Sequence, residues 1–152
     1  MAPSSASTAR SYAFDDRNIR WRKFEGLENF VGYVFDVDEK RNVVDFILKF
    51  DANKRIFLHR HLALTNTFVV HGEHRLYEPN GDLKEIRRVG SYTVSPPGSP
   101  HTEGGGDEGC VVLYSVRPDG DGIFEVLDDN LNVVGVLTVR DFQNAMEEQK
   151  KA

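Results

Sequence analysis

The sequence has a single cysteine, Cys110, among its 152 residues. One cysteine excludes an intramolecular disulfide and a metal site built on a Cys-x-x-Cys pair. Residues 1–11 are rich in serine and alanine but lack the apolar stretch of a secretory signal peptide. We therefore expect residues 1–11 to be a disordered tail and the protein to work in the reducing cytoplasm.

Long apolar runs and a surplus of basic residues are also missing. The longest apolar runs, at 68–70 and 110–114, are far shorter than the roughly 20 residues of a membrane-spanning helix. The net charge is -5, and the basic residues do not cluster on one segment. A nucleic-acid-binding protein needs a basic face, so we expect neither a membrane nor a nucleic acid as partner.

Short apolar runs between glycines, prolines and polar turns predict many β-strands. The pair Asn80-Gly81 predicts a β-hairpin, because both residues tolerate a positive φ. The strand-like runs cover residues 32–37, 43–48, 67–70, 74–77, 91–94, 110–116, 123–127 and 133–137. Strands at roughly 8–12-residue spacing predict an antiparallel sandwich or barrel.

A helical pattern occurs only at the end of the chain. Residues 139–150 are predicted to form a helix with Thr138 as N-cap, since Phe142 and Met146 lie four residues apart on one face. No linker or repeat interrupts the preceding sequence. We expect one domain over residues 12–152 that ends in this helix.

The five histidines all fall between positions 59 and 101. His59 and His61 are two residues apart, so on a strand both imidazoles point to one face and reach the same point inside a barrel. His101 follows a Pro-Pro-Gly turn at 96–98. Proline fixes φ and glycine permits a positive φ, so this turn can direct the histidine toward the interior. These three histidines are the candidate metal ligands.

Four residues reproduce the second sequence motif of the cupin superfamily: Gly, five residues, Pro-x-Gly, two residues and His. They are Gly90, Pro96, Gly98 and His101. His59 and His61 supply the His-x-His of the first motif, and Gly72 its last glycine. The chain therefore resembles the cupins. This resemblance implies an all-β double-stranded β-helix, a jelly-roll barrel, holding one divalent metal ion on His59, His61 and His101.

The sequence departs from the first cupin motif at its glutamate. Thr65 or Asn66 stands there, depending on register, and either is a candidate catalytic residue that hydrogen-bonds a metal-bound water. Asn53 and Gly105 replace two other motif residues. Three neutral imidazoles leave the charge of a divalent ion uncompensated, which favours an anionic bidentate ligand such as an enolate.

Short three-histidine cupins include acetylacetone dioxygenase and 2,4'-dihydroxyacetophenone dioxygenase, and residues 90–102 and 127–135 resemble this subgroup. The resemblance implies an Fe(II)-dependent dioxygenase that uses O2 to cleave a carbon–carbon bond of a β-diketone or hydroxyketone. It also suggests a homodimer. The alternative is a non-oxidative lyase, isomerase or hydrolase with zinc, nickel or manganese. A ligand-binding sensor without turnover is a third reading.

Four further side chains near the motifs have no assigned place. His71 and His74 are expected to be solvated or hydrogen-bonded rather than ligands. Glu103 and Asp107 follow His101 closely, but Gly104–Gly106 between them predicts a flexible loop at the barrel rim. We therefore expect no carboxylate from this segment to become a fourth ligand.

Overall fold

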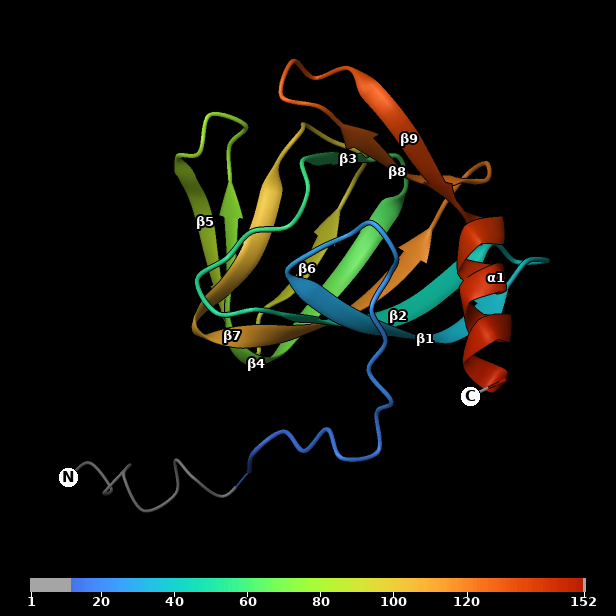
Figure 1. The fold of residues 1–152 in the computed structure, drawn as a ribbon, viewed down its shortest axis with the longest axis horizontal. Helices are drawn as coiled ribbons and strands as arrows, with labels where there is room; N and C mark the ends of the chain where they lie inside the picture. The colour runs from blue at the N-terminus through green and yellow to red at the C-terminus, as the bar shows by residue number, and fades with distance from the viewer. Residues whose placement is uncertain (1–11, 152) are drawn as a thin grey trace.

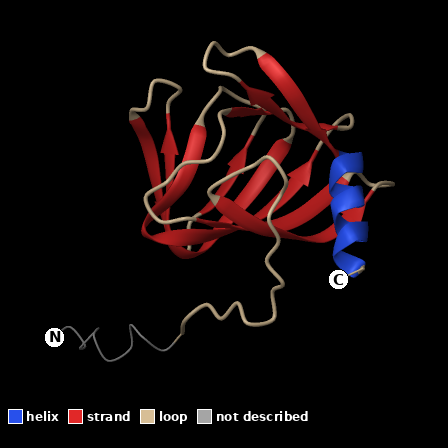
Figure 2. Ribbon diagram, in the orientation of Figure 1, coloured by secondary structure: helices blue, strands red, loops and turns tan. Residues whose placement is uncertain are grey.

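The computed structural model describes residues 12–151, so the predicted tail at residues 1–11 lies outside the described part. Nine strands and one helix follow one another along this part of the chain (Figure 1). Their bounds are β1 Phe30–Asp38, β2 Val43–Phe50, β3 His59–His61, β4 Leu64–Tyr77, β5 Leu83–Arg88, β6 Tyr92–Ser95, β7 Thr102–Arg117, β8 Gly122–Leu127, β9 Val133–Thr138 and α1 Val139–Lys150. Figure 2 shows the predominance of strands and the helix at the C-terminal end. The predicted fold class is confirmed.

The strands form two antiparallel sheets. The larger has the order β1-β2-β7-β4-β5, with β6 also paired to β4, and the smaller has the order β3-β8-β9. Figure 1 shows the long strands of the larger sheet curving beneath the smaller sheet. Sheets that face each other bury the alternate side chains of each strand between them, so the space between the sheets holds the core.

Aromatic rings fill one end of this core. Phe46 on β2 stacks on Tyr114 of β7, with ring centroids 4.9 Å apart and planes 5° from parallel. Phe124 on β8 meets Phe46 edge-on at 6.3 Å, and Phe142 on α1 lies 4.9 Å from Phe46. Both sheets and the helix therefore contribute to one aromatic cluster.

The predicted C-terminal helix begins and ends as the pattern indicated. The Thr138 side chain accepts a hydrogen bond from the Asp141 backbone, and the Asp141 side chain accepts one from the Thr138 backbone, forming a capping box. Gln149 bonds both the amide and the carbonyl of Val34, at 2.8 and 2.9 Å, which fastens α1 to β1. Within the described residues, no helix is long and apolar enough to cross a membrane.

The predicted hairpin at Asn80-Gly81 joins β4 to β5, but its turn differs from the expected one. Of Asn80 and Gly81, only Gly81 has a positive φ, of 96°. Its amide donates to the carbonyl of Glu78. Pro79 and Asn80 are therefore the central residues of the turn. Proline favours this arrangement because its φ is already set near the required value.

The prediction of a flexible rim loop at Gly104–Gly106 is wrong. All three residues belong to β7 and are buried. A Cβ added to Gly104 would lie 1.8 Å from the carbonyl oxygen of Lys54, and one at Gly105 would lie 2.5 Å from the Cα of Gly109. These glycines permit close backbone approach, so they make the segment tightly packed rather than mobile.

Candidate metal centre

The His-x-His pair lies on β3, which pairs with β8. His59 and His61 are only 2% and 8% exposed, and their ring centroids are 5.2 Å apart. Phe124 on β8 packs edge-on against both rings. The alternation of the strand thus presents both imidazoles to one point inside the barrel.

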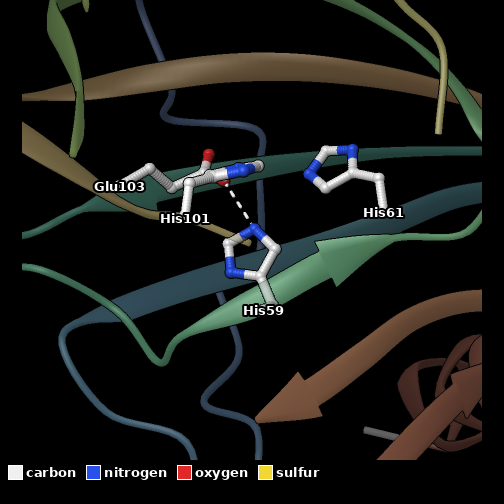
Figure 3. Close-up of side chains that lie close together, drawn as sticks. All are labelled: His59, His61, His101 and Glu103. Carbon is white, nitrogen blue, oxygen red and sulfur yellow. Dashed lines mark hydrogen bonds and ion pairs between the residues drawn. The ribbon is translucent and has the colours of Figure 1, made fainter. Parts of the chain in front are cut away.

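His101 reaches the same point from the residue just before β7, where it forms an isolated β-bridge with His59. Its amide and carbonyl both bond the backbone of His59, at 2.9 and 3.0 Å, and the amide of Gly98 in the preceding turn donates to the carbonyl of His61. The ring of His101 lies 4.5 Å from that of His59 and 5.0 Å from that of His61, centroid to centroid. Figure 3 shows the three rings converging.

Each of the three rings has its Nδ1 engaged. Nδ1 of His59 lies 2.9 Å from the carbonyl oxygen of Phe57, and Nδ1 of His101 lies 3.2 Å from that of Ser99. Nδ1 of His61 lies 3.1 Å from Thr65 Oγ1. A neutral imidazole that donates from Nδ1 carries its lone pair on Nε2. The Nε2 of His61 is buried without a hydrogen-bond partner, as expected for an atom that awaits a ligand.

Glu103 is the residue that sequence reasoning excluded and the structure places in the cluster. Its side chain is buried, with Oε2 2.9 Å from Nε2 of His59 and 3.3 Å from Nε2 of His101 (Figure 3). The exclusion rested on the rim loop, which does not exist. A usable signal was present, because His101-x-Glu103 has the same two-residue spacing as the His-x-His pair.

Two further side chains hold the other oxygen of Glu103. His74 on β4 donates from Nε2 to Oε1 at 2.8 Å, and the Tyr114 hydroxyl donates to the same oxygen. The ring of His74 stacks on Phe50 with a centroid distance of 5.5 Å. No sequence motif pointed to Tyr114 as part of the site.

The charges in the cluster are settled by burial and hydrogen bonding. Burial alone would raise the pKa of Glu103, but its contacts with the imidazoles of His101, His59 and His74 outweigh burial and hold the pKa well below its usual range. Burial, with the charge of His59 as a smaller cause, lowers the pKa of His61 to about 3. One buried carboxylate thus faces imidazole nitrogens, an arrangement that a cation stabilises.

Of the remaining candidates, Thr65 contacts His61 of the cluster, and the others lie apart from it. Thr65 is fully buried beside the second histidine, whereas Asn66 donates from Nδ2 to the Tyr92 hydroxyl at 2.8 Å. His71 is exposed, and the side chain of Asp107 is 86% exposed. Of the two alternatives for the missing motif glutamate, Thr65 is therefore the one in contact with a histidine of the cluster.

Two cavities of different chemistry reach the cluster. A cavity of about 220 Å³ lies between β2 and α1, has mostly apolar walls, and includes His59 and Glu103 in its lining. A second, of about 270 Å³, lies beside β5 and the turn at 95–99, and His61, His101 and Glu103 line it. The cluster is thus approached by an apolar space on one side and a polar space on the other.

The donor atoms fit a metal ion. One atom from each of His59, His61, His101 and Glu103 lies within 4.8 Å of all the others. Imidazole and carboxylate together are the ligands of divalent iron, zinc, nickel and manganese sites. The unpartnered Nε2 of His61 and the buried carboxylate are both satisfied by such an ion. The cluster is therefore able to hold one divalent metal ion.

Solved structures similar to this chain include cupins. An RmlC-like cupin from Ralstonia eutropha has a TM-score of 0.72 at 19% identity, covering 91% of this chain and 86% of its own. The chain has a cupin fold. An acetylacetone dioxygenase from Acinetobacter johnsonii has a TM-score of 0.70 at 15% identity, covering 90% of this chain and 91% of its own. A DMSP lyase from Ruegeria pomeroyi has a TM-score of 0.55 at 18% identity, covering 70% and 60%.

Sequence comparisons do not extend this result beyond the fold. No protein-family model matches the sequence, and no curated protein matches it. The similarity to solved structures is of low identity and shows the fold alone.

Proposed function

We propose that this cupin is a mononuclear, Fe(II)-dependent dioxygenase that cleaves a carbon–carbon bond of a β-diketone or hydroxyketone. His59, His61 and His101 would hold the ion through Nε2, and Glu103 through Oε2. The observation that carries the proposal is the convergence of three imidazoles, each with Nδ1 engaged, on one point. The similarity in fold to an acetylacetone dioxygenase supports the choice of reaction.

Divalent iron bound in this cluster would supply Lewis acidity toward an enolate and one-electron chemistry toward dioxygen. The residues of the chain set the charge around it. The sequence predicted an uncompensated dication, but the carboxylate of Glu103 is buried in the cluster and would cancel one unit of charge. One positive charge remains, so a singly charged enolate still gains from binding there.

The walls of the two cavities determine how a substrate lies. The apolar cavity has no lysine or arginine among its lining residues, and its mostly apolar walls adjoin His59 and Glu103. An alkyl or aryl substituent is stabilised there by burial. The polar cavity beside His61 and His101 then remains for dioxygen and for the oxygen atoms of the products.

A non-oxidative metal-dependent cupin is the second candidate, and Glu103 is the observation that favours it. A buried carboxylate beside the metal-binding histidines is suited to act as general base in an elimination or isomerisation. The similarity in fold to a DMSP lyase agrees with this alternative. A sensor without turnover is less well supported, because two cavities give access to the cluster.

Anaerobic reconstitution separates the two enzymatic readings. The protein is loaded with Fe(II), and a panel of β-diketones and hydroxyketones is added with and without O2. A dioxygenase consumes one O2 for each substrate cleaved and leaves the substrate intact under anaerobic conditions, and the zinc-loaded protein is inactive. Conversion that proceeds equally without O2 would establish the non-oxidative reading instead.

The homodimer and the cytoplasmic location predicted from the sequence stay predictions. Open sheet edges are commonly covered by a second copy of the chain, which is the physical reason to expect a dimer. Light scattering at micromolar concentration measures it, and a monomer mass contradicts it.

A further inference from the structure

The carboxylate of Glu103 is shared between two groups of side chains. Oε2 faces Nε2 of His59 and His101 at 2.9 and 3.3 Å. Oε1 accepts hydrogen bonds from Nε2 of His74, at 2.8 Å, and from the hydroxyl of Tyr114. A carboxylate with two donors on one oxygen has a fixed plane, so its other oxygen has a fixed direction.

Packing alone does not account for the imidazole of His74. The side chain is 1% exposed and stacks on Phe50, and its Nδ1 is buried without a hydrogen-bond partner. A buried unpaired nitrogen is destabilising, whereas leucine would fill the position at no such cost. The hydrogen bond to Glu103 is the interaction that an imidazole makes at this position and a leucine could not.

The same reasoning applies to the hydroxyl of Tyr114. Its ring stacks on Phe46, which a phenylalanine would do equally well. The hydroxyl is wholly buried, where an unpaired O–H would be costly, and it donates to Glu103. Both donors thus lie deep in the barrel and meet on one oxygen of one carboxylate.

We propose that His74 and Tyr114 are positioning residues that hold Oε1 of Glu103, so that Oε2 is directed at the metal ion. The inference rests on the proposed function to the extent that the cluster binds a divalent ion. The pair adds no ligand atom. It stabilises one orientation of a ligand that otherwise rotates freely about its last bond, and it therefore strengthens metal binding.

Metal titrations of five proteins test this pair. The wild type is compared with Tyr114→Phe, His74→Leu and His74→Gln, and with His71→Leu as a matched control on an exposed histidine of the same strand. The glutamine amide nitrogen can replace Nε2 of His74 as donor, whereas leucine cannot. Dissociation constants for Zn(II) are measured by competition with a chromophoric chelator, and Co(II) visible spectra report the ligand set.

Tyr114→Phe and His74→Leu are each expected to weaken Zn(II) binding about 10-fold or more and to change the Co(II) spectrum. His74→Gln should bind within about threefold of the wild type, and His71→Leu should not differ from it. If the wild type binds the metal and the Leu and Phe variants bind equally tightly with unchanged Co(II) spectra, the positioning role is wrong while the proposed function stands. If the wild type binds no divalent metal, the proposed function itself fails.

Melting temperatures of the metal-free variants separate a loss of stability from a loss of metal affinity. A merely structural role for His74 would lower the Tm of the metal-free His74→Leu and His74→Gln proteins alike and would not follow the metal affinity. Equal losses of affinity in both His74 variants would overturn the role assigned to Nε2 as donor. Rescue by glutamine alone supports it.

Discussion

Thr65 Oγ1 lies 3.1 Å from Nδ1 of His61 and donates its own proton to the carbonyl of Ala63 at 3.0 Å. Because the hydroxyl proton is used on the carbonyl, the oxygen accepts from the Nδ1–H of His61. The lone pair of His61 is thereby placed on Nε2, which faces the other members of the cluster. The position at which the first cupin motif has a glutamate is in contact here with a histidine that would itself be a ligand.

Replacing Thr65 by valine is expected to weaken metal binding about 10-fold, because Nδ1 of His61 loses the acceptor that fixes its tautomer and ring orientation. Thr65→Ser keeps the hydroxyl and should bind like the wild type. Zn(II) competition titrations measure both. Equal affinities of the valine and serine variants would show that the contact does not orient His61.

Glu103→Gln is expected to lower metal affinity by at least about 10-fold, since it removes the negative charge that compensates half of the ion's charge. The control is Glu108→Gln, on an exposed glutamate of the same strand β7. Isothermal titration with Zn(II) separates the two. If the Glu103 variant retains wild-type affinity, the carboxylate is not a ligand, and the sequence-based set of three histidines is sufficient.

Alanine at His59, His61 or His101 should reduce metal affinity on the order of 100-fold, because each removes a ligand. Chelation of the wild-type metal should also lower the Tm. A ligand present at about 100 times its Kd adds about 2.7 kcal/mol to the free energy of unfolding, or about 5–10 °C in a domain of this size. Full metal occupancy in His59→Ala would refute the ligand assignment.

The apolar cavity under α1 predicts a preference for substrates with an uncharged ring. Its volume of about 220 Å³ exceeds the roughly 150 Å³ of an engineered apolar cavity that binds benzene. Exposed Glu25 and Asp141 also belong to its lining and should repel a carboxylate. An aryl β-diketone should therefore bind the zinc-loaded protein at least about 10-fold more tightly than its ring-carboxylated analogue.

A substitution that fills this cavity tests its use. Ala145→Phe, on the face of α1 that lines the cavity, should remove the preference for an aryl over a methyl substituent. Asn144→Phe places the same side chain on the exposed face of the helix and should leave the preference intact. Calorimetric affinities of the two diketones give the ratio. An unchanged ratio in a correctly folded Ala145→Phe protein would mean that the substrate does not enter this space.

The parts of the site that rest on local rules could be predicted from the sequence. Residues two apart on a strand share a face whatever surrounds them, so His59 and His61 had to point the same way. The helix start at Thr138 is equally local, since its capping box depends on hydrogen bonds within a few residues. These features, with the motif spacing, were sufficient for the fold and for the three histidines.

Contacts between distant strands could be decided only by the tertiary structure. His74 and Tyr114 reach Glu103 because β4 and β7 pair in one register interrupted by two bulges, and a slip of one residue would turn their side chains to the other face. Gly104–Gly106 reads as a flexible loop when glycine is judged by its backbone freedom alone. In the folded chain Gly104 and Gly105 admit the backbone of residues 51–55, and this packing carries Glu103 into the cluster.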